Sequence, residues 1–209
     1  FIPTSGMTMG DINLSQGATI DVSGNATGTV RIRGGQFVIT DATISADTVD
    51  AKGALTAVDI QLTGDLSISN DLVPAITART TGSGDAGAIK IASANFTAAS
   101  NTFDILSFID THTSGSGRAG DVSITTGNLQ VTGSLDGFAS FIDTGTEGPG
   151  HGGNVTITAR NLQLDLTFIN TGNFFANAFG VDATGSAGNV NISTDSLNLY
   201  FTQIVTDAF

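Results

Sequence analysis

The stretch SGSGRAGDVSITTGNLQVTG, residues Ser114–Gly133, decides the fold because its pattern returns along the chain. Its centre, AGDVSI at 119–124, is a small residue and a glycine followed by alternating polar and apolar residues. The same motif surrounds four glycines that lie 33, 33 and 35 residues apart, namely Gly87, Gly120, Gly153 and Gly188. Self-similarity at a nearly fixed period predicts a repeat architecture.

Further strands follow each motif. A second alternating segment begins eight residues after each glycine, as in NLQV at Asn128, and SFIDT recurs at Ser107 and Ser140. Strands with one apolar face cannot bury that face within a single repeat, so the repeats stack as coils. We therefore predict an all-β fold, a three-sided parallel β-helix in which Val122 stacks between Ile89 and Val155. A β-sandwich, the alternative, requires neither equal spacing nor repeated tetrapeptides.

The first half of the chain carries a tighter repeat. Gly10, Gly28 and Gly64 begin similar motifs 18 and 36 residues apart, with a degenerate step at Ala46. This spacing predicts one β-helix domain over 1–209 with about eight coils. Residues 1–86 are expected to form coils of about 18 residues, and 87–209 coils of about 33 residues with Gly-rich loop insertions. The seven repeat glycines are expected to be structural.

Composition narrows the classes of partner. The net charge is −12, only seven residues are Lys or Arg, and charged residues make up 12% of the chain. Nucleic-acid binding requires clustered basic residues, so we expect no nucleic-acid partner. No apolar run approaches the roughly 18 residues of a membrane span. The chain contains no Cys, which does not fix its compartment but suits exported bacterial proteins.

The Gly-rich stretches 82–87, 115–120 and 148–153 do not match phosphate-binding loops. A P-loop ends in Lys and Ser or Thr and precedes a helix, whereas a strand pattern follows each stretch here. We expect these glycines to provide positive φ where the chain turns into the next coil.

Three aspartates are the main candidate binding residues. Asp110 and Asp143 occupy equivalent repeat positions, and Asp182 joins them after a shortened loop. Stacked carboxylates repel unless compensated, which makes Asp110 and Asp143 weak calcium candidates. The alternative is that each accepts hydrogen bonds from the backbone of its own turn, and no cofactor is then required.

The two histidines fall at different points of the repeat. His112 and His151 form no column and are not accompanied by Cys, so no metal site is expected from them. They remain candidate binding residues in the loops. His151 shares its column with Asp85 and Arg118, and an ion pair between the latter two is expected to contribute little if exposed.

Catalysis receives weak support. Enzymes that cleave polysaccharides need clustered carboxylates, or an acid paired with Arg or Lys on one wall. Lys90 and Arg118 come nearest, and they lie in different columns. We therefore expect no enzyme, with a polysaccharide lyase or glycoside hydrolase as the alternative.

The units GHGGNVTITARNLQL at 150–164 and GSAGNVNISTDSLNL at 185–199 resemble the repeats of filamentous-haemagglutinin-like bacterial exoproteins. The resemblance is best over 82–209. It implies a right-handed β-helix, export to the surface or medium, and adhesion or matrix roles. The Asn-Pro-Asn motifs of that family's secretion domain do not occur, because the three prolines are Pro3, Pro74 and Pro149.

Three functional hypotheses follow. The first is a shaft or adhesive segment of a secreted or surface-exposed bacterial exoprotein, with cell-surface or matrix glycans or proteins as partners. Binding would use loops near 110–119, 143–152 and 170–186. The second is a self-assembling extracellular filament or surface-layer subunit whose copies stack end to end. The third is the carbohydrate-active enzyme.

Overall fold

The structure, a computed structural model, describes residues 9–70, 74–100, 107–133, 139–172 and 183–207. Within these ranges all regular secondary structure is β-strand, which confirms the predicted all-β class. Residues 1–8, 134–138 and the segment that holds Asp182 and Phe179 lie outside them. In the same described ranges, no helix is long and apolar enough to cross a membrane.

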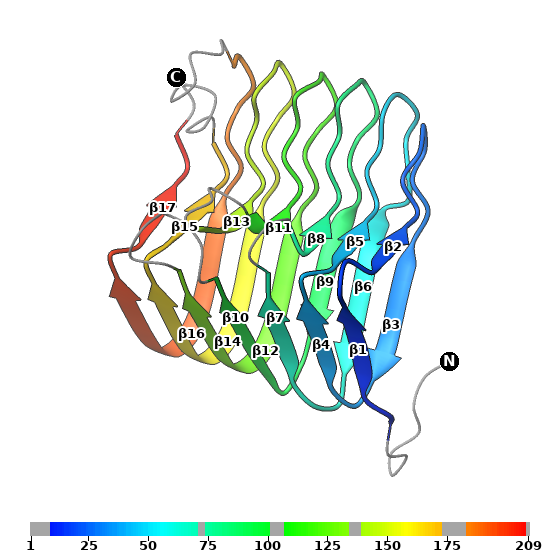
Figure 1. The fold of residues 1–209 in the computed structure, drawn as a ribbon. Coiled ribbons are helices and arrows are strands. Elements are labelled where there is room, and N and C mark those ends of the chain that lie inside the picture. Colours follow the sequence, from blue (N-terminus) through cyan, green and yellow to red (C-terminus); the bar gives the residue numbers. More distant parts are fainter. Residues whose placement is uncertain (1–8, 71–73, 101–106, 134–138, 173–182, 208–209) are drawn as a thin grey trace.

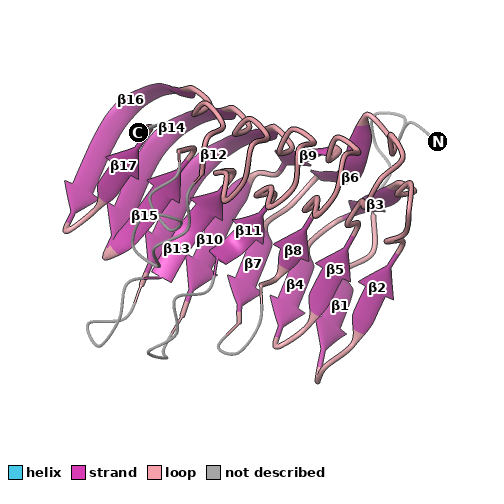
Figure 2. Ribbon diagram, turned by 90° about the horizontal axis from the view of Figure 1, so that it is seen from above, coloured by secondary structure: helices cyan, strands magenta, loops and turns pink. Residues whose placement is uncertain are grey.

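The strands form two parallel sheets (Figures 1 and 2). A seven-stranded sheet contains β2 (Thr19–Asp21), β5 (Thr43–Ser45), β8 (Ile76–Thr77), β11 (Ser107–Asp110), β13 (Ala139–Asp143), β15 (Thr167–Asn170) and β17 (Gln203–Val205). A ten-stranded sheet contains β1 (Ile12–Ser15), β3 (Val30–Gly34), β4 (Phe37–Thr40), β6 (Thr56–Leu62), β7 (Leu66–Ser69), β9 (Ala88–Ala92), β10 (Asn95–Ala99), β12 (Val122–Thr132), β14 (Val155–Asp165) and β16 (Val190–Tyr200).

The larger sheet has two arms joined through its long strands. The first part of β12 pairs with β9 and its second part pairs with β10. Strands β14 and β16 continue both arms. Each coil therefore contributes one segment to each arm and one to the seven-stranded sheet, which is the arrangement of a parallel β-solenoid.

Coil length increases along the chain. In the arm that begins with β1, paired residues lie 25, 29 and 30 positions apart from Ile12 through Phe37 and Leu66 to Phe96. Later partners lie 33, 33 and 35 positions apart, from Phe96 to Leu197. The unit of about 33 residues is confirmed, whereas the 18-residue coil of residues 1–86 is wrong. The predicted eight coils are not confirmed, because the sheet with one strand per passage contains seven.

Two corners of each coil explain the error. Gly10 and Gly64 precede β1 and β7 of one arm, whereas Gly28 precedes β3 of the other. A glycine at each corner makes half of a coil resemble a whole one. By contrast, Gly87 and Gly120 are true equivalents, because a Cβ on the second would overlap the carbonyl oxygen of the first.

The core consists of apolar columns that run along the solenoid axis. One column joins Val30 to Val190, and Val122 lies in it between Ile89 and Val155, as predicted. Another joins Ile20 to Ile204 through isoleucine alone. The inner positions are almost completely buried between the two ends. Burying this apolar surface is the main stabilising contribution to the fold.

Glycine-rich segments stack at one corner. We call residues 82–87, 115–120, 148–153 and 183–188 the glycine loops. A Cβ on Gly117, Gly150 or Gly185 would overlap the carbonyl oxygen of the equivalent glycine one coil earlier. The expectation of positive φ is wrong here, since among the described glycines only Gly17 has it. The glycines are required because successive backbones approach one another too closely for any side chain.

Buried threonines hold the glycine loops closed. The hydroxyls of Thr111, Thr144 and Thr171 donate to the carbonyls of Gly120, Gly153 and Gly188 at 2.6, 2.8 and 3.0 Å. A second row, whose members pair by isolated β-bridges, places Thr80, Thr113 and Thr146 at the other end of the loops. Their hydroxyls donate to the carbonyls of Gly84, Gly117 and Gly148.

Candidate functional site

The two stacked aspartates lie where strands of the seven-stranded sheet end. Asp110 ends β11, Asp143 ends β13, and the two are register partners, which confirms their predicted equivalence. Thr77 precedes them in the column and Asn170 follows. Asp110 is 5% exposed and Asp143 is 7% exposed, so their carboxylates need internal partners.

Each residue of the column accepts a hydrogen bond from the backbone two residues later. Asp110 Oδ1 accepts from the N–H of His112 at 3.1 Å, and Asp143 Oδ1 accepts from that of Gly145 at 2.9 Å. Asn170 repeats the contact with Gly172 at 3.1 Å. These are the backbone contacts that the sequence analysis set against calcium binding.

Two cationic side chains complete a buried charge cluster, which we define as Arg79, Asp110, His112 and Asp143. Arg79 Nε donates to Asp110 Oδ2 at 2.8 Å, and its terminal nitrogen is equally close. His112 Nδ1 lies 2.7 Å from Asp110 Oδ1. Charges of opposite sign therefore alternate between neighbouring coils, which offsets the repulsion expected for stacked carboxylates.

The sequence analysis missed Arg79 and misplaced His112. It counted positions from the repeat glycines, across loops whose lengths differ. Counting from the strand ends places Arg79 two residues after Thr77 and His112 two residues after Asp110. The two cations then fall in adjacent rows beside the same carboxylate.

Burial and neighbouring charges perturb the acid–base properties of the cluster. Burial alone would raise the pKa of Asp110, but His112 and Arg79 outweigh it and hold that pKa below its usual range. Burial and the neighbouring Asp110 raise the pKa of Asp143 to about 7. For His112, burial is outweighed by the hydrogen bond and charge of Asp110, so its pKa rises to about 9.

The same cluster offers ligand atoms to a cation. One atom each from Asp110, His112 and Asp143 lies within 4.8 Å of the others. However, Asp110 Oδ1 and Oδ2 already accept hydrogen bonds from His112 and Arg79. Calcium prefers several oxygen ligands and would have to displace Arg79, so the donor set suits a self-contained network better than a metal centre.

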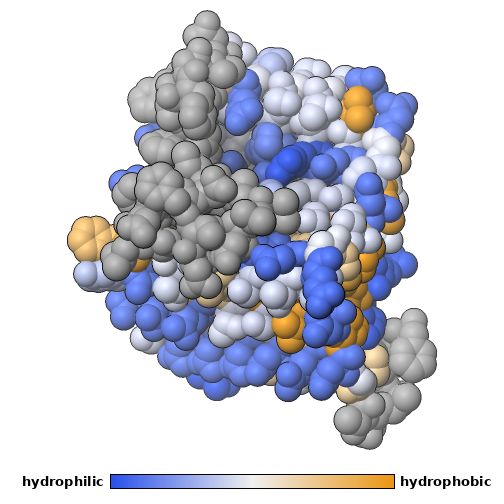
Figure 3. Space-filling model, in the orientation of Figure 1, coloured by the Kyte–Doolittle hydropathy of each residue, from blue (hydrophilic) through white to orange (hydrophobic). Residues whose placement is uncertain are grey.

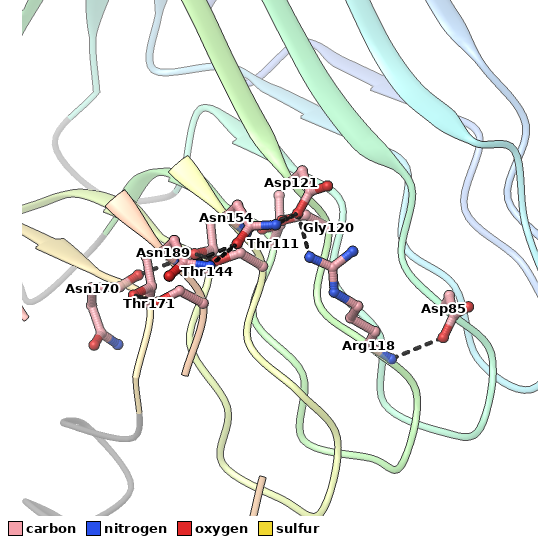
Figure 4. Close-up of polar contacts among 12 residues, drawn as sticks. Asp85, Thr111, Arg118, Gly120, Asp121, Thr144, Asn154, Asn170, Thr171 and Asn189 are labelled. Carbon is pink, nitrogen blue, oxygen red and sulfur yellow. Dashed lines mark hydrogen bonds and ion pairs between the residues drawn. The ribbon is translucent and has the colours of Figure 1, made fainter. Parts of the chain in front are cut away.

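The other predicted binding residues lie elsewhere. His151 is exposed on a glycine loop, with Nδ1 2.7 Å from Ser186 Oγ, whereas Asp182 lies outside the described residues. The expected Asp85–Arg118 contact exists, but it uses the backbone N–H of Arg118 at 3.0 Å. The guanidinium of Arg118 instead pairs with Asp121 at 2.7 Å (Figure 4).

Polar ladders run along the surface from these residues. Asp121 Oδ1 accepts from the side-chain amide of Asn154, whose own oxygen accepts from Asn189, both at 3.1 Å (Figure 4). A second ladder links Asn161 to Asn128 and Asn128 to Asn95, each at 2.6 Å. Amide side chains repeated at the coil spacing thus hydrogen-bond to one another.

A small pocket of about 170 Å³ lies beside the glycine loops. Its lining brings together Lys52, Asp85, Arg118 and Asp121, the acid–cation combination that the sequence analysis did not find. The volume is below the roughly 300 Å³ at which ligand pockets begin. Asp121 is moreover engaged by Arg118 and Asn154, which leaves it poorly placed as a general base.

Comparison with known proteins adds no assignment: no protein-family model matches the chain, and neither curated proteins nor solved structures give a match.

Proposed function

We propose that this chain is a structural shaft, a right-handed β-helical segment of a large secreted or surface-exposed bacterial exoprotein. The observation that carries the proposal is the use of polar side chains for stacking. Thr144 closes a glycine loop, Asn128 bridges two neighbouring coils, and Asp110 joins Arg79 to His112. Right-handedness follows from the strong preference of parallel crossover connections. Side chains engaged in this way stiffen a rod.

Adhesion would be a property of the outer loops. The proposed partners are cell-surface or matrix glycans or proteins, bound near 110–119, 143–152 and the described part of 170–186. His151 supports this placement because it is exposed on a stacked loop. The resemblance of 150–164 and 185–199 to exoprotein repeats supports a location at the outer surface of a bacterium. Calcium at Asp110 and Asp143 stays a prediction.

Surface labelling tests the proposal. Antibodies raised against this chain should label intact source cells, or detect the native polypeptide in the medium. Peptide mapping of that polypeptide should reveal further Gly-Asn-Val or Gly-Asn-Ile repeats. A polypeptide found only in the cytoplasm would overturn the proposal.

An activity screen tests the enzymatic alternative. Depolymerisation of a polysaccharide panel, lost on Asp121→Asn in the pocket and retained on the distant Asp195→Asn, would replace the structural assignment with a carbohydrate-active one. The shaft proposal expects no depolymerisation from either the parent chain or the variants.

A further inference from the structure

The last described coil leaves its inner surface uncovered. Leu197 and Leu199 of β16 and Ile204 of β17 continue columns that are buried in earlier coils. Their exposed fractions are 50%, 42% and 38%, whereas Leu162, Leu164 and Ile169 beneath them are at most 1% exposed. The same strands present unpaired backbone groups, which favour the addition of another strand.

The first described coil shows the complementary surface. Ile12 and Leu14 of β1 and Ile20 of β2 are only partly buried at the opposite end of the same three columns. In Figure 3, hydrophobic residues are visible at the right-hand end, where β1 and β3 lie in Figure 1.

The two surfaces match position by position. Continuing the registers across the gap places Leu197 on Ile12, Leu199 on Leu14 and Ile204 on Ile20. The other arm matches as well, with Val190 on Val30 and Ile192 on Ile32. We propose that the β16–β17 edge binds the β1–β3 edge of a second copy, so that copies stack head to tail.

Strand direction favours this pairing over the joining of two identical edges. All strand pairs of the solenoid are parallel, and a head-to-tail copy keeps every strand parallel to its new neighbour. Exposed charges agree, because the β3 edge carries Arg31 and the β16 edge carries Asp195. The net charge of −12 opposes association at long range, so added salt should promote it.

Such an interface is heterologous and does not close on itself, which makes short filaments the expected product. The proposal rests on the two edges and goes beyond the shaft function, since a rod that never stacks is still a shaft. Failure of stacking would therefore leave the surface-labelling result untouched.

Sedimentation velocity tests the stacking. The parent chain should sediment as larger species with rising concentration, and more so at high salt. Leu199→Lys blocks one edge and Leu14→Lys blocks the other, so each variant alone should be monomeric. An equimolar mixture should form a one-to-one dimer and stop there, because one free edge of each kind remains.

Matched controls separate stacking from misfolding. Asn198→Lys adds the same charge to β16 in the exposed outer row of Gln130 and Gln163, and should still assemble. Ile204→Lys, on a different strand of the same edge, should reproduce the Leu199→Lys result, with circular dichroism confirming the fold of each variant. A parent chain that is monomeric at all concentrations and salts would overturn the proposal. So would dimers of either blocked variant alone.

Discussion

The early coils and the late coils share their inner columns but differ in their outer parts. In the column that supplies Thr111, Thr144 and Thr171 to the late coils, the early coils have Ala46 and Ala78. The hydroxyl of Thr48 is buried without a partner, whereas its column mates Thr80 and Thr113 donate to glycine-loop carbonyls. The comparison teaches that apolar columns suffice to build coils, and that longer coils add polar contacts which hold their loops together.

The largest expected effect comes from breaking the close approach of the glycine loops. In Gly150→Ala the new methyl group would overlap the carbonyl oxygen of Gly117, which belongs to an equally packed backbone. We expect a loss of about 3 kcal/mol in the free energy of unfolding, at the upper end for overpacking. Urea unfolding provides the measurement.

The early coils supply the control for this change. A Cβ on Gly28 would approach nothing closer than 3.5 Å, so Gly28→Ala should leave the unfolding midpoint nearly unchanged. Equal losses from the two substitutions would show that close stacking is not what distinguishes the late coils.

The next effect is the pH dependence of the buried charge cluster. The folded-state pKa of Asp143 is about 7, above its ordinary 3.8, so the folded chain retains a proton that the unfolded chain releases. The free energy of unfolding should therefore fall as pH rises from about 4 to about 7. His112, raised from 6.5 to about 9, extends the decline toward pH 9, while Asp110 has the opposite sign and acts at lower pH.

Asp143→Asn isolates this contribution. The amide copies Asn170 in the next coil, can still accept from Gly145, and does not titrate. The variant should match the parent chain in stability near pH 5 and exceed it near pH 8, as measured by urea midpoints across that range. A parent and a variant with parallel pH profiles would contradict the assignment to Asp143.

The smallest expected effect converts one late coil to the early type. Thr144→Ala removes the hydroxyl that donates to Gly153 at 2.8 Å and leaves an alanine, as at Ala78. The net loss should be about 1 kcal/mol, typical of one buried hydrogen bond. Thr144→Ser retains the hydroxyl and should recover most of the stability; equal losses would assign the effect to the methyl group.

The inner columns were predictable from sequence because alternation along a strand directly reports which side chains face inward. The repeat spacing alone therefore aligns Val122 with Ile89, and Asp110 with Asp143. Coil length in the first half could not be predicted, because Gly10 and Gly28 mark two corners of one coil. The charge cluster was only half visible, since Arg79 reaches Asp110 across coils whose loops differ in length. The stacking of Gly150 on Gly117 was likewise hidden, because a turn glycine and a close-approach glycine look alike in sequence.

The equal register of β12 and β14 has a consequence for how the gene can change. Ten residue pairs from Val122–Val155 to Thr132–Asp165 align at a constant offset of 33. A duplication of that many codons would insert a complete coil whose neighbours meet the side chains they met before. An insertion of one codon within a strand would instead exchange its inner and outer faces. Inheritance can therefore lengthen or shorten this molecule in whole coils, and selection can adjust its reach without redesigning its interior.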